Sequence, residues 1–218
     1  LVPLEWSDTA YENYLGAIQS LNEKYGEVPV RKAMHKGQYA HPNSIHYGGG
    51  AATWSNKTLD LICREHLSRS KRAAMIDIHT GLGPYGYGEL MTPSKPGERV
   101  FNLFFDWYGD QVHSTTAGAS LYAGSKGSIL AGFQPLSETL EWAAIGLEYG
   151  TRERETMRKA MLANTWLHVH GDLDSDLGRQ IKRDVKDASY PDEDEWKSLV
   201  WERGVEVIGI ALQRFDQM

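Results

Sequence analysis

The sequence has little of three things: cysteine, long apolar runs and positive charge. Its 218 residues contain one cysteine, Cys63, so neither a disulfide framework nor a cysteine thiolate cluster around zinc can form within the chain. No apolar run approaches the roughly 20 residues of a membrane-spanning helix. The net charge of -6 leaves no basic excess for binding nucleic acid or an anionic membrane surface. We therefore expect a soluble, cytoplasmic protein that acts on a small or peptide-like substrate.

Length and composition indicate one globular domain. Hydrophobic residues make up 41% and charged residues 24% of the chain, and a chain of this length can bury a substantial core. No internal repeat, low-complexity segment or long linker divides it. We expect residues 1–218 to form a single α/β domain. Cys63 lies in a segment with helical periodicity and is expected to be a core residue rather than a nucleophile.

Helical periodicity recurs along the chain. Ser7 and Asp8 can cap a first helix, and Gly26 can end it. Acidic residues 192–195 are expected to cap the last helix rather than to bind a metal, because the helix dipole favours negative charge there. The other expected helices begin near Pro29, at Ser55, at about Arg154 and within the segment from Asp172 to Met218.

Two short apolar runs, residues 73–78 and 142–147, predict buried strands of an α/β sheet. The glycine- and proline-rich segment 81–96 is interpreted as a loop, whereas the aromatic run 100–108 fits a helix or a buried strand. The predicted fold is α/β, with a mixed central sheet flanked by helices and the C-terminal helices on one of its faces.

A polar residue follows each predicted strand: His79 follows the first and Glu148 the second. Ligands of open α/β sheets bind outside the carboxyl ends of the strands, so we expect the two side chains to meet in one cleft. An imidazole beside a glycine-rich loop can bind zinc, which in catalytic sites takes three protein ligands and a water. A carboxylate between Leu147 and Tyr149 should have a raised pKa, as a general base requires.

The same residues also fit structural roles. A histidine at the end of a strand is commonly a hydrogen-bonded structural residue, and Glu148 could cap the helix that follows it. His168 and His170 alternate as a ligand pair could, but they end a predicted helix, where such side chains are common. His113 lies beside Ser114, yet the chain has no Gly-x-Ser-x-Gly motif of a serine hydrolase. The residues alone leave the choice open.

Two motifs surround these residues, 76–86 around His79 and 146–151 around Glu148, and both resemble motifs of the zinc carboxypeptidase superfamily, which includes the succinylglutamate desuccinylase and aspartoacylase type. Residues 76–86, Ile-Asp-Ile-His-Thr-Gly-Leu-Gly-Pro-Tyr-Gly, resemble its segment with the third zinc ligand, particularly in a mainly bacterial branch. Residues 146–151, Gly-Leu-Glu-Tyr-Gly-Thr, resemble the strand with its catalytic glutamate. The resemblance implies a three-layer sandwich in which His79 binds zinc and Glu148 is the base. Further similarity to that branch covers residues 37–42, 47–49, 54–56 and 166–171.

Neighbours of His79 are expected to assist it. Tyr85 and Tyr87 follow it and could hydrogen-bond a substrate carbonyl or a developing oxyanion, although aromatic packing over the loop explains them equally well. Asp77 and Thr80 are expected to fix the imidazole. Strand alternation places Asp77 on the same side as His79.

One departure from the superfamily bears on the metal. The superfamily holds zinc with a His-x-x-Glu pair upstream of the third ligand and binds the substrate carboxylate with an Asn-Arg motif, and this chain contains neither motif. We therefore expect a polypeptide that lacks the N-terminal strands of the fold, whose missing His and Glu ligands belong to an upstream segment and which binds zinc poorly in isolation.

Two functions are consistent with the sequence. The first is a zinc-dependent hydrolase of amide bonds, acting on a C-terminal peptide bond or an N-acyl amino acid, with Glu148 activating a metal-bound water. The alternative is a non-catalytic binding or assembly domain of the same fold that has lost its metal site.

Overall fold

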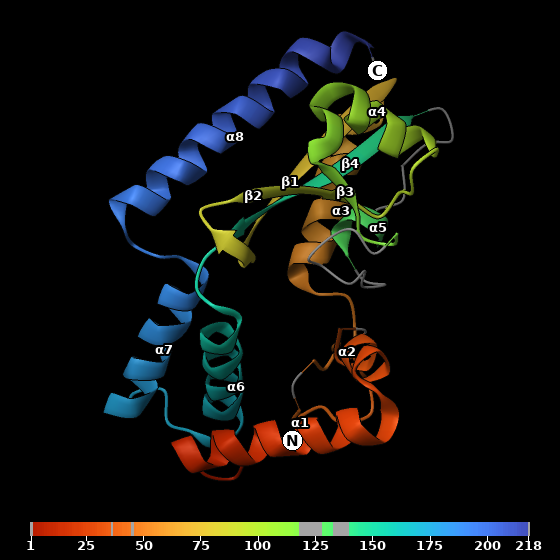
Figure 1. The fold of residues 1–218 in the computed structure, drawn as a ribbon. Coiled ribbons are helices and arrows are strands. Elements are labelled where there is room, and N and C mark those ends of the chain that lie inside the picture. Colours follow the sequence, from red (N-terminus) through yellow and green to blue (C-terminus); the bar gives the residue numbers. More distant parts are fainter. Residues whose placement is uncertain (1, 36, 45, 118–127, 133–139, 218) are drawn as a thin grey trace. The chain divides into compact units, whose positions relative to one another are not determined.

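Figure 1 shows a computed structural model that describes residues 2–35, 37–44, 46–117, 128–132 and 140–217. The chain divides into two compact units. We call Leu1–Gly50 with Thr151–Asp192 the helical unit, and Ala51–Gly150 with Glu193–Met218 the sheet unit. The prediction that the whole chain forms one domain stays a prediction.

The sheet unit is built on a four-stranded mixed sheet with the strand order β1-β4-β2-β3. β1 and β4 are parallel, β2 runs antiparallel to β4, and β3 runs parallel to β2. The predicted α/β fold with a mixed sheet is confirmed. The strands are β1 (Arg72–Tyr85), β2 (Gly88–Thr92), β3 (Val112–Ser114) and β4 (Glu141–Gly150).

Strands occupy more of the chain than the sequence predicts. The interpretation of residues 81–96 as a loop was wrong, because β1 continues to Tyr85 and β2 begins at Gly88. Glycine marks an irregularity and a turn here: β1 shifts register between Gly81 and Tyr85, and Gly86 takes a φ of 69° in the turn before β2. β1 and β2 are therefore joined by a short turn, and both pair with β4.

One hydrophobic core joins the sheet to α4 (Arg99–Tyr108) and α8 (Asp194–Arg214). The undecided aromatic run is helix α4, because its aromatic side chains recur every three or four residues and form one buried face. The Tyr108 hydroxyl donates to Val207 O at 3.0 Å and so ties α4 to α8. The most buried members of this core are Leu90, Phe104, Ala143, Ile145, Leu147, Tyr149, Trp196 and Val207.

The sheet unit also contains α3 (Trp54–Leu67) and the short α5 (Ile129–Gly132). The predicted cap of α3, Ser55, was wrong: Thr53 caps the helix, and its hydroxyl accepts from Asn56 N at 3.3 Å. Cys63 is buried in α3, as predicted. Short 3-10 turns follow α4 at Gly109–Gln111 and α8 at Phe215–Gln217.

The helical unit consists of α1 (Asp8–Tyr25), α2 (Glu27–His35), α6 (Arg154–His170) and α7 (Asp176–Ser189). The predicted start and end of α1 are confirmed: the Ser7 hydroxyl accepts from Ala10 N at 3.1 Å, and Gly26 ends the helix with a φ of 85°. Across the described ranges of both units, no helix has the length and apolar character needed to cross a membrane.

Candidate functional site

His79 and Glu148 lie side by side in the sheet. They are cross-strand partners on the parallel strands β1 and β4, whose backbones in such a pair lie about 4.8 Å apart. Because paired residues of neighbouring strands point to the same face, the two side chains share one face of the sheet. Both residues lie within their strands rather than after them. The structure thus brings the two principal sequence candidates together.

Asp77 holds the imidazole of His79. The two residues are two positions apart on β1, and Asp77 Oδ2 accepts a hydrogen bond from His79 Nε2 at 2.6 Å. The His79 side chain is 55% exposed, whereas that of Asp77 is 19% exposed. This bond leaves Nδ1 as the ring nitrogen that can bind a metal or a substrate. Thr80 is the partner of Tyr149 and points to the opposite face.

Glu148 is a buried carboxylate with one fixed oxygen. Only 7% of the residue is exposed, and Oε1 accepts a hydrogen bond from Leu82 N at 2.9 Å. Burial raises the pKa of Glu148, while the Leu82 N–H and the nearby His79 act to lower it. The negative charges of Glu89 and Asp77 act to raise it further. This environment favours proton uptake at a higher pH than an exposed glutamate shows.

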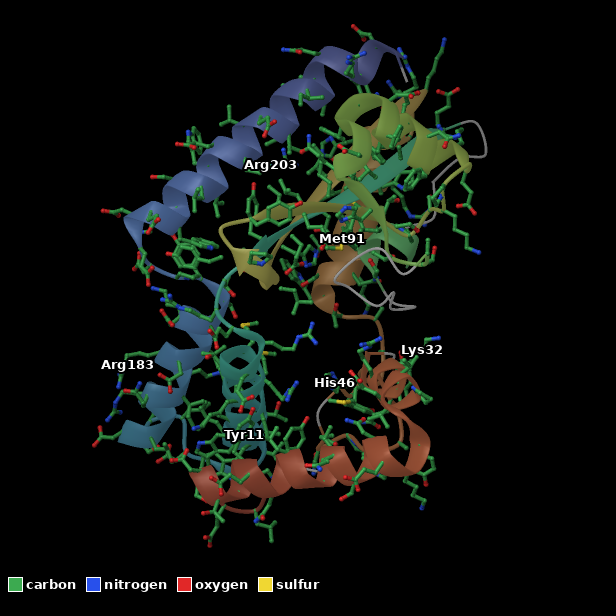
Figure 2. The ribbon with its side chains drawn as sticks, in the orientation of Figure 1. Tyr11, Lys32, His46, Met91, Arg183 and Arg203 are labelled. Carbon is green, nitrogen blue, oxygen red and sulfur yellow. The ribbon has the colours of Figure 1, made fainter. Side chains whose placement is uncertain are left out.

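The structure places two further residues, Glu89 and His113, beside Glu148 and His79. The sequence alone did not connect them with this pair. Glu89 on β2 is the antiparallel partner of Glu148 and is 2% exposed. Its Oε1 lies 2.8 Å from Nδ1 of His113 on β3, a side chain that is 32% exposed. His113 is the partner on β3 of Met91, which lies two positions after Glu89 on β2 and so points to the same face as Glu89 (Figure 2). His79, Glu148 and Glu89 therefore form a row across three strands, and His113 reaches this row from the fourth.

A signal for Glu89 exists in the sequence. The segment Gly88–Thr92 has a glutamate next to two apolar residues, and every residue of it is buried in the sheet. A short run of this kind is compatible with a buried strand, although the glycines before it and the proline after it favour a loop. A glutamate within a buried strand is uncommon and points to a paired or functional carboxylate.

Tyr85 and Tyr87 lie elsewhere in the sheet unit. Both line a hollow of about 510 Å³ beside α8, together with Leu199 and Arg203. The Tyr85 hydroxyl donates to the carboxylate of Glu193, just before α8 begins. Arg203 reaches from α8 toward the sheet, where its Nε donates to Gly88 O at 3.4 Å (Figure 2). The structure does not bring these tyrosines to His79, and their role in substrate binding stays a prediction.

The described residues fit only part of a zinc site. Within the described ranges, no group of three His, Cys, Asp or Glu side chains is placed to hold a metal ion. A catalytic zinc typically takes three protein ligands, of which His79 could be one. His168, considered as an alternative ligand, lies in the last turn of α6 in the helical unit, and its Nε2 lies 2.6 Å from Lys182 Nζ. The full ligand set that the resemblance implies is thus absent from the described part of the chain.

Comparison with known proteins gives a family match. Residues 1–203 match the model of a family described as "Protein of unknown function (DUF2817)". Searches of the curated proteins and of the solved structures return no match. The resemblance to the zinc carboxypeptidase superfamily therefore stays a prediction from the sequence motifs.

Proposed function

We propose that this chain, which belongs to the DUF2817 family, carries the general base of an amide hydrolase. The observation that supports this proposal most strongly is the pairing of exposed His79 with buried Glu148 on one face of the sheet. The proposed substrates are a C-terminal peptide bond or an N-acyl amino acid. Zinc is the proposed cofactor, with His79 as one of its ligands.

In the proposed reaction Glu148 moves one proton. Ionised Glu148 takes a proton from the water whose oxygen forms a bond to the amide carbon. The C–N bond then breaks, and the same proton passes to the leaving nitrogen, so the products are a carboxylic acid and an amine. A carboxyl group with a raised pKa suits both steps, because its carboxylate is a stronger base than that of an ordinary glutamate and its acid form can return the proton to the leaving nitrogen. The Leu82 N–H holds one oxygen and leaves the other to act.

His79 and Asp77 are proposed to work as a pair. The 2.6 Å hydrogen bond to Asp77 fixes the ring of His79 and its tautomer, as carboxylate partners of ligand histidines commonly do. The other zinc ligands would have to come from outside the described residues, because the described chain does not complete the set.

The described residues do not complete a zinc ligand set, and this observation supports a second candidate, a non-catalytic binding or assembly domain of the same fold. Metal analysis of the purified full-length protein separates the two functions. One zinc per chain that is lost in His79→Ala supports the hydrolase. Protein that binds no zinc, with or without this substitution, supports the second candidate.

Activity is tested by amine release from a panel of short peptides and N-acyl amino acids after incubation of the full-length protein with zinc. Glu148→Gln should abolish the release, because an amide cannot take up the proton. Glu141→Gln is the matched control, since Glu141 is an exposed residue at the start of the same strand. Equal rates for wild type and Glu148→Gln would refute the assignment of the base.

A further inference from the structure

α8 presents two different apolar faces. Its inner face belongs to the core of the sheet unit, where Trp196 and Val207 are 2% and 0% exposed. The Tyr149 hydroxyl donates to Val200 O at 3.0 Å and fixes this side of the helix to the sheet. The position of α8 within the sheet unit is thus set without any use of its outer face.

The outer face of α8 bears a stripe of four large apolar side chains. Trp201 is 72% exposed, Val205 52%, Ile208 42% and Leu212 74%. The four residues are spaced by four, three and four positions, which is the alternating spacing of the seam in a two-stranded coiled coil. An exposed stripe of this kind marks a surface for another helix rather than for water.

We propose that α8 pairs in parallel with α8 of a second copy of this chain through this stripe. In heptad terms, Val205 and Leu212 occupy a positions, and Trp201 and Ile208 occupy d positions. Lys197 then falls at a g position and Glu202 at the following e position. In a parallel pair each g residue faces the following e residue of the other helix. Lys197 of each copy therefore meets Glu202 of the other, twice by two-fold symmetry.

The charged residues beside the stripe also favour a parallel over an antiparallel pair of helices. In an antiparallel pair the e flank of one helix meets the e flank of the other, because one helix is reversed. The e positions of α8 and the turn after it hold Gly209 and three carboxylates, Glu195, Glu202 and Asp216. An antiparallel pair would thus bring carboxylates together, which is unfavourable. The charge pattern fits the parallel pair of identical chains.

The length of the seam predicts a weak association. From Trp201 to Leu212 the helix axis advances about 17 Å, at about 1.5 Å per residue. Four side chains on one helix bury less than the ~800 Å² per partner of a standard stable interface. We expect a monomer–dimer equilibrium with a dissociation constant in the micromolar range, visible as a rise in mean mass with concentration.

The test is sedimentation velocity of the full chain over a range of concentrations. Lys197→Glu and Glu202→Lys alone should each raise the dissociation constant at least tenfold, because like charges then face each other. An equimolar mixture of these two variants should restore the dimer, because both cross pairs are then opposite in charge. Glu206→Lys is the control of equal charge change away from the seam, and it should leave the dissociation constant within about twofold.

A cysteine variant tests the orientation. In a parallel pair the two copies of Val205 face each other, so Val205→Cys should form an intermolecular disulfide under mild oxidation. The native Cys63 is buried and does not compete. A chain that stays monomeric at every concentration, or a dimer that neither the charge variants nor the mixture changes, would overturn the proposal. A dimer that forms without the Val205→Cys cross-link would overturn its parallel orientation.

Discussion

Gly150, at the end of β4, has no room for a side chain. A Cβ built there would lie 1.9 Å from Pro84 O and 2.4 Å from Gly83 O, whereas real Cβ atoms essentially never approach another atom below 3.0 Å. Gly150→Ala must therefore push the end of β1 away by at least the difference between 3.0 and 1.9 Å, about 1.1 Å. This end of β1 follows Leu82, whose N–H binds Glu148, so the strain reaches the proposed site.

The cost of this substitution follows from the contacts it breaks. Gly86 N donates to Gly150 O at 2.9 Å and Gly150 N donates to Tyr87 O at 3.0 Å. A shift of this size lengthens both bonds beyond hydrogen-bonding distance, and each is worth about 1 kcal/mol. Overpacking adds about 1–3 kcal/mol. We expect the free energy of unfolding to fall by about 3–5 kcal/mol, which for a chain of this size lowers the Tm by about 6–20 °C.

Urea denaturation and thermal unfolding followed by circular dichroism measure this loss. Gly209→Ala is the control, because nothing lies within 4 Å of its Cβ position in α8 and alanine favours the helix by about 0.5–1 kcal/mol. The control should be as stable as wild type or slightly more so. A Gly150→Ala protein within about 1 kcal/mol of wild type would refute the close approach of β1 and β4.

Four further outcomes are expected. Glu148→Gln should be more stable than wild type at pH 7, because burial raises the pKa of Glu148 and penalises its charged form in the folded state. This difference in stability should vanish as the pH falls below 4.5, the ordinary pKa of the group. Urea titrations at several pH values measure it. Glu89→Gln should lower the pKa of Glu148 in a carboxyl NMR titration, because the negative charge of Glu89 raises it. Asp77→Asn should lower hydrolysis by about 10- to 100-fold in the amine-release assay and change the Tm little, because the His79 side chain of this pair is 55% exposed and its pairing with Asp77 contributes little to stability. Phe104→Ala should lower the free energy of unfolding by about 3–5 kcal/mol in urea titrations, because Phe104 is 0% exposed.

The parts of the fold that local chemistry determines could be predicted from the sequence. The cap at Ser7 and the end of α1 at Gly26 depend on residues within one turn, and both are as predicted. The placement of His79 and Glu148 on one face follows from two apolar runs that end in polar residues, because parallel strands bring such ends together. The cap of α3 was misplaced by two residues since Thr53 and Ser55 are both good capping residues.

What the sequence did not reveal depends on pairing between distant strands. Glycine and proline flank the five residues of β2 and favour a loop in the local sequence pattern, whereas the pairing with β4 holds these residues as a strand. The contact between Glu89 and His113 joins positions 24 residues apart, so no local pattern indicates it. The helix α4 was ambiguous because a buried aromatic run fits either structure until its partners are known.

The central claim is that Glu148 is a catalytic base on the face that it shares with His79. Amine release by the full-length wild-type protein and its Glu148→Gln and Glu141→Gln variants, measured side by side with zinc present, tests it most directly. We predict turnover by wild type and Glu141→Gln and none by Glu148→Gln. Equal turnover by all three proteins would contradict the claim.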